Sequence, residues 1–143
     1  MGLLTKKNVL NIILGIILIG IVSFLFITMY LLNNGNPYHN YLVNKHIPAH
    51  LEQLGYTGED IVKQQRIAPK HGVNHSVYHE HYEVIFKDEP QLEYLYGLTK
   101  KEKNVVQFCE KETLIAKNTY GYMTTEKTNH SESECIGYLD NRN

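Results

Sequence analysis

The sequence predicts an α+β protein: an N-terminal transmembrane helix, then a small outer domain with one helix packed on an antiparallel sheet of about three or four strands. Three observations lead to this fold. An uncharged hydrophobic run covers residues 9–32, a helical pattern of apolar residues follows over 38–54, and apolar and polar residues alternate over 76–87. The first pattern is typical of a membrane span, the second of a half-buried helix and the third of a half-buried strand.

These patterns divide the chain into five predicted segments. They are a cytoplasmic N-terminus (1–8), a transmembrane signal anchor (9–32), a linker (33–37), an extracytoplasmic α+β domain (38–112) and a partly disordered C-terminal extension (113–143). The linker is rich in Asn, with Gly35 and Pro37 as further breakers.

The anchor is predicted from its length and lack of charge. At about 1.5 Å per residue, the run from Val9 to Leu32 is long enough to cross a hydrocarbon core of about 30 Å. A cleaved signal peptide has a shorter run and ends in a small-x-small site, which this sequence lacks. Lys6 and Lys7 precede the run, and the next charged residue is Lys45. The positive-inside rule therefore predicts a cell-membrane protein with its N-terminus in the cytoplasm and its domain outside.

The outer domain is predicted to begin with a helix and to continue as a meander of strands. Pro48 either kinks the helix or starts a new helical turn, and Gly55 is placed to cap its C-terminus. The strands are expected over 61–67, 76–87, 92–98 and 105–110, and a further strand within 113–123 stays open. The polar run 124–134 contains no apolar residue and is expected to be mobile.

Charge bears on the possible partners of the domain. After residue 32 the chain has 12 basic and 15 acidic residues, which leaves a net charge of −3 with histidine neutral. Binding of nucleic acid needs clustered Lys and Arg, so we expect no nucleic-acid partner.

Histidine is the most suggestive residue type for chemistry. On the strand expected over 76–87, His79, His81 and Glu83 share the face predicted to be wet, where they form a candidate site for zinc or another divalent ion. The spacing matches no established zinc motif. The alternatives are a solvated face without a ligand and a domain that responds to pH, because all eight histidines follow residue 32.

The two cysteines, Cys109 and Cys135, both lie in the part expected outside the membrane. An oxidising exterior permits a disulfide between them. The sequence does not show that their Cα atoms come within reach, so the bridge and two free thiols both stay open, and free thiols are favoured.

No pattern in the sequence predicts an enzyme. A phosphate-binding glycine loop and a GxSxG nucleophile motif are both absent, and no cofactor is expected. We therefore expect a non-enzymatic module that binds another protein or a component of the cell envelope, with metal binding or a pH response as the alternative.

The basic start, the hydrophobic helix and three further groups of residues carry a resemblance to a known family. The three groups are Leu51–Tyr56 with Gly58–Ile61 behind it, and Val84–Pro90 leading into Tyr94 and Tyr96. From the anchor to about Glu112 the chain resembles a family of small single-pass membrane proteins from low-GC Gram-positive bacteria, known only as a domain of unknown function. The resemblance implies a membrane-tethered outer domain, and it carries no activity or catalytic residue with it.

Overall fold

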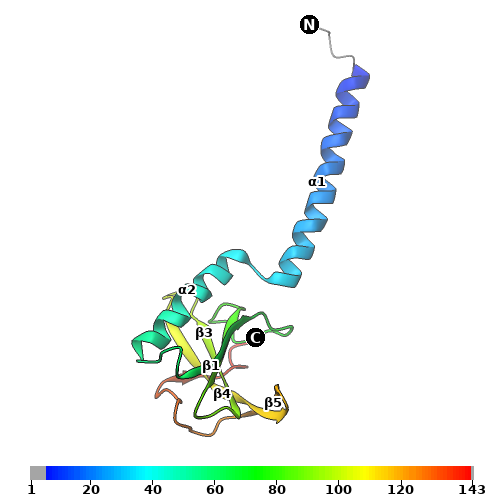
Figure 1. Cartoon of the computed structure of the whole chain (residues 1–143). Coiled ribbons are helices and arrows are strands. Elements are labelled where there is room, and N and C mark those ends of the chain that lie inside the picture. Colours follow the sequence, from blue (N-terminus) through cyan, green and yellow to red (C-terminus); the bar gives the residue numbers. More distant parts are fainter. Residues whose placement is uncertain (1–5, 143) are drawn as a thin grey trace. The chain divides into compact units, whose positions relative to one another are not determined.

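The computed structural model of the chain describes residues 6–142, and most of the predicted cytoplasmic segment 1–8 lies outside this range. The chain divides into two compact units, the first ending at Gly35 and the second beginning at Asn36. The first unit is the helix α1 (Lys6–Asn34), drawn in blue in Figure 1. The second unit contains the helix α2 and the sheet.

α1 confirms the predicted N-terminal helix. Within Lys6–Asn34 no residue is buried, although this helix carries the uncharged run of 9–32. It is long and apolar enough to cross a membrane, judged by length and composition. Its end is marked by Gly35, which has a φ of 72° and donates its N–H to the carbonyl of Leu31 at 2.9 Å.

α2 (Pro37–Gln53) confirms the second predicted helix. Asn36 caps its start by accepting the N–H of Tyr38, and Pro37 occupies the first turn, where a missing N–H costs nothing. The helix continues through Pro48 instead of ending there. At its end, Gly55 has a φ of 92° and donates to the carbonyl of Glu52, while Tyr56 donates to Leu51. This pair of bonds is a Schellman motif, so glycine caps the helix as predicted.

The sheet contains more strands than the sequence predicts. Residues 6–142 form six strands: β1 (Ile61–Ile67), β2 (His81–Phe86), β3 (Leu92–Leu98), β4 (Val105–Ala116), β5 (Thr119–Thr124) and β6 (Cys135–Ile136). β1 to β5 form an antiparallel meander in chain order, and β6 pairs in parallel with the first half of β4. β1 and β3 have the predicted bounds. β2 is shorter than predicted, and β4 is longer because its second half pairs with β5.

α2 covers one face of the sheet. Its buried side chains Leu42, Val43, Ile47 and Leu51 pack on the even-numbered residues of β2 and β3. Tyr94, Tyr96 and Phe86 are the largest fully buried members of this core. Figure 1 shows α2 lying across the strands.

The second face is also buried, and here the structure differs from the prediction. Val77, Leu95 and Phe108 form a second core with Ile136 and Tyr138. The last two belong to residues 125–142, which we call the C-terminal strap. The sequence predicts that this face is exposed to water, but His81 on it is fully buried. The sequence also predicts a partly disordered extension, but the strap lies against the sheet.

Polar contacts fix the strap along its length. The buried side chain of Gln107 donates to the carbonyl of His130 and accepts the N–H of Glu132, at 2.8 and 2.9 Å. Asn74 donates its backbone N–H to the carbonyl of Tyr138 at 2.8 Å. The amide of Gln107 therefore pairs with the strap's backbone, so a run without apolar side chains is held through its peptide groups.

Candidate functional site

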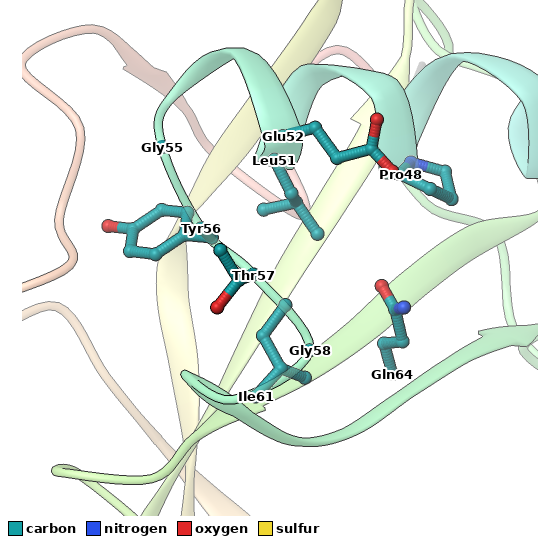
Figure 2. A pocket seen from close by; sticks show the side chains of 9 residues that line it. All are labelled: Pro48, Leu51, Glu52, Gly55, Tyr56, Thr57, Gly58, Ile61 and Gln64. Atoms are coloured by element: carbon teal, nitrogen blue, oxygen red, sulfur yellow. The ribbon is translucent and has the colours of Figure 1, made fainter.

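A cavity of about 380 Å³ lies beside the Schellman motif that ends α2. Figure 2 shows its wall, made by Pro48, Leu51 and Glu52 from α2, the turn from Gly55 to Gly58, and Ile61 and Gln64 from β1. Leu51 and Ile61 supply apolar surface, while Glu52, Thr57 and Gln64 supply polar groups. The volume lies in the lower part of the range of ligand sites, which suits one side chain or a small ring.

The turn that forms this cavity is held by its own hydrogen bonds. Asp60 accepts both the backbone N–H and the hydroxyl of Thr57, at 2.8 and 2.7 Å. These bonds lower the pKa of the Asp60 carboxyl, because they stabilise its charged form. Hydrogen bonds within the turn itself therefore hold this part of the cavity wall.

Tyr56 also lines a second, more open cavity of about 510 Å³, together with Lys87, Asp88 and His130. The Tyr56 hydroxyl donates to Nδ1 of His130 at 2.9 Å, and Nε2 of His130 donates to Asp88 at 2.7 Å. The imidazole also stacks on Phe86 with a centroid distance of 3.9 Å.

These bonds join a hydroxyl, an imidazole and a carboxylate in a row. Burial, followed by the charge of Glu132, raises the pKa of the Tyr56 hydroxyl, so the phenol keeps its proton. The hydrogen bond from His130 lowers the pKa of Asp88. The bonds attach the strap to the end of α2 and to the turn after β2.

The predicted metal residues are not brought together. His79 is exposed and donates to the carbonyl of Pro69 at 2.6 Å, whereas His81 is buried between the rings of Phe108 and Tyr138. Burial lowers the pKa of His81 to about 4, so its imidazole is neutral near pH 7.

Glu83, the third predicted ligand, contacts Lys63 at 3.4 Å and Gln65 at 2.7 Å. Among residues 6–142 no group of three His, Cys, Asp or Glu side chains is placed to hold a metal ion. Nothing in the structure favours the metal alternative.

The sequence does not predict a group of carboxylates on the second face of the sheet. Glu93 lies directly across from Glu112 in the sheet, near Glu83, and Lys63 contacts Glu93 at 3.1 Å. Burial, and then the charge of Glu83, raises the pKa of Glu93 to about 7. One sequence signal could have predicted that Glu83 and Glu93 share a face, because both stand at odd-numbered positions of successive strands. The register that places Glu112 beside them follows from no local pattern.

The two cysteines are joined. Cys109 and Cys135 form a disulfide with a Cα–Cα distance of 5.1 Å, so the preference for free thiols is wrong. Parallel pairing of β6 with β4 brings the two residues together, and this pairing of distant segments is invisible in the local sequence.

Comparison with known proteins finds one match. A family model described as a protein of unknown function (DUF3139) matches residues 7–96, which include α1, α2, β1, β2 and most of β3. No curated protein and no solved structure matches the chain significantly. Because the family model covers more than half of the sequence, the chain belongs to the DUF3139 family.

Proposed function

We propose that this protein is a membrane-anchored, extracytoplasmic binding module without enzymatic activity, whose domain engages another protein or a component of the cell envelope. The observation that carries the proposal is the exposure of α1. Its apolar side chains are uncovered along the whole of Lys6–Asn34, and an apolar surface of that size is stable only in lipid or against a partner.

The orientation rests on the basic residues beside α1. Lys6 and Lys7 begin the helix, and Lys45 is the first charged residue beyond its end. The positive-inside bias favours a cytoplasmic N-terminus. The disulfide between Cys109 and Cys135 supports the same orientation, because disulfides persist outside the reducing cytoplasm.

The cavity beside Tyr56 supports binding as the role of the domain. Its wall is the capped end of α2 and the bonded turn after it, and both lie in the part of the chain that the family model matches. A concave site whose wall is already hydrogen-bonded binds at a lower cost of ordering, which favours recognition of a partner.

Photo-crosslinking in intact cells tests this role. A photoreactive residue replaces Gln64 in the cavity wall, and crosslinked partners are purified with the full chain and identified. Gly58→Phe places a bulky side chain at the cavity wall and should abolish crosslinking, while Gly72→Phe is its matched control. An added Cβ at either glycine meets no atom within 4 Å, and neither has a positive φ.

The outcomes separate the proposal from its competitors. A partner that is lost with Gly58→Phe and kept with Gly72→Phe supports binding at the cavity. A partner recovered equally with both variants overturns the cavity as the site. The hypothesis of a non-enzymatic module would be overturned if the protein turned over an envelope substrate and a single polar-to-Ala change abolished that activity. An alkaline phosphatase fused after the strap should be active, and an inactive fusion would overturn the orientation.

A further inference from the structure

One exposed face of α2 is not explained by the packing of the domain. Tyr38 and Tyr41 are 61% and 60% exposed, although α2 buries four apolar side chains on its other face. Together with Lys45 they stand three and four residues apart, which places all three on one side of the helix. The Lys45 ammonium lies 5.9 Å from the centre of the Tyr41 ring. We call these three residues the tyrosine face.

The charge of this region differs from that of the rest of the domain. From Asn36 to Leu51 the sequence has no acidic residue and contains Lys45 and three histidines, whereas the chain after residue 32 has a net charge of −3. A helix face with one ammonium, two phenols and no carboxylate of its own is complementary to phosphate groups.

Chain connectivity limits the distance between the last residue of α1 and the first residue of α2. Only Gly35 and Asn36 separate α1 from α2, and three Cα–Cα steps of about 3.8 Å span no more than about 11 Å. The start of α2 is also fixed to its own domain. The buried carboxylate of Glu80 accepts the backbone N–H of Asn36 at 2.8 Å and contacts His39 at 3.1 Å.

We propose that the tyrosine face of α2 rests in the headgroup layer of the membrane that α1 spans, with the Tyr38 and Tyr41 rings between headgroups and Lys45 against lipid phosphate. This inference rests on the proposed anchoring by α1. Tyrosine rings favour the membrane–water interface because they are apolar along the ring and polar at the hydroxyl. Lysine extends its ammonium toward phosphate while its methylene groups cover apolar surface.

Site-directed spin labelling of the purified full chain in lipid vesicles tests the contact. The two native cysteines form a disulfide, so an introduced cysteine is the single thiol that a nitroxide reagent can label. One label replaces Tyr41, a second replaces Ile19 in α1, and a third replaces Tyr122, which is 78% exposed on β5. Collision with oxygen reports lipid exposure, and collision with a water-soluble nickel chelate reports exposure to water.

The label at Tyr41 should collide with the nickel chelate several-fold less often than the label at Tyr122. Changing Tyr38→Ser and Lys45→Ser together should restore collision at the Tyr41 label. The matched control is Leu54→Ser with Val62→Ser, which removes two exposed apolar side chains elsewhere and should leave collision unchanged. Vesicles containing an anionic phospholipid should give stronger protection than zwitterionic vesicles.

Each unfavourable result identifies what has failed. Lipid exposure at Ile19 together with equal nickel collision at Tyr41 and Tyr122 overturns the headgroup contact and leaves the anchor in place. Water exposure at Ile19 overturns the anchor and this inference with it. Protection of Tyr41 that persists in the Tyr38→Ser/Lys45→Ser variant, or that disappears equally in the control, overturns the role of the tyrosine face.

Discussion

Removing the disulfide should destabilise the domain by an amount that follows from its position in the chain. Cys109 and Cys135 are 26 residues apart, and closing a loop of that length removes entropy from the unfolded chain. The chain-entropy relation gives about 3.5 kcal/mol at 25 °C for such a loop. We expect the variant Cys109→Ser/Cys135→Ser to lose this stability and still to fold, because Gln107 and the second core also hold the strap.

Urea unfolding of residues 36–143, which form a compact unit, measures the effect. Near-ultraviolet circular dichroism follows the buried tyrosines. With a denaturant slope of about 1–3 kcal/mol per molar, the midpoint should fall by roughly 1–3 M.

The reduced wild-type protein is the matched control, because it keeps both sulfur atoms and lacks only the bond between them. Its midpoint should agree with that of the double variant. An unchanged midpoint after reduction would refute the entropic reasoning, and a reduced protein without a cooperative transition would show that the strap depends on the bond alone.

Four further predictions concern single residues. Phe108→Ala should lower the free energy of unfolding by about 3–5 kcal/mol in the same urea assay, since the ring is fully buried in the second core. Gly55→Ala should cost about 1 kcal/mol, measured in the same way, because φ is 92° at this cap. Two buried groups should give opposite pH dependences when unfolding is repeated between pH 4 and 7. Burial lowers the pKa of His81 from 6.5 to about 4. Between these two pH values the unfolded chain binds a proton at His81 and the folded chain does not, so the free energy of unfolding falls as the pH drops from 6.5 to about 4. His81→Leu should remove this fall. Burial, with the charge of Glu83, raises the pKa of Glu93 from 4.5 to about 7. The folded state therefore binds a proton at Glu93 before the unfolded chain does, and the free energy of unfolding rises as the pH drops from about 7 to 4.5. Glu93→Gln should remove this rise; equal slopes in both variants would contradict these assignments.

The elements that the sequence predicts well are those with strong local periodicity. α2, β1 and β3 have nearly the expected bounds, because apolar spacing, the Gly55 cap and the turns define them locally. The second half of β4 and β5 lack such a pattern. Their apolar side chains, including Leu114 and Tyr122, are mostly exposed, so alternation does not mark a buried face there.

The lining of the cavity beside Tyr56 is local, from Pro48 to Gln64, whereas the surroundings of the predicted metal residues come from distant parts of the chain. His81 alternates with apolar neighbours as a wet residue would, yet Phe108 and Tyr138 cover it from later parts of the chain. Alternation shows that two faces differ and does not show whether the polar one meets water or another segment. The same limit applies to the partners of Tyr56, since His130 lies in the polar run that was expected to be mobile.

The strap has a consequence for how the domain is made. The residues that cover the second face, Ile136 and Tyr138, are synthesised roughly 40 residues after β3 is complete. At about 5–20 residues per second, the ribosome needs about 2–8 s to add them. Until those residues are present, Val77 and Leu95 lack their cover. Termination or cleavage before residue 135 would make that interval permanent and produce a species prone to aggregate.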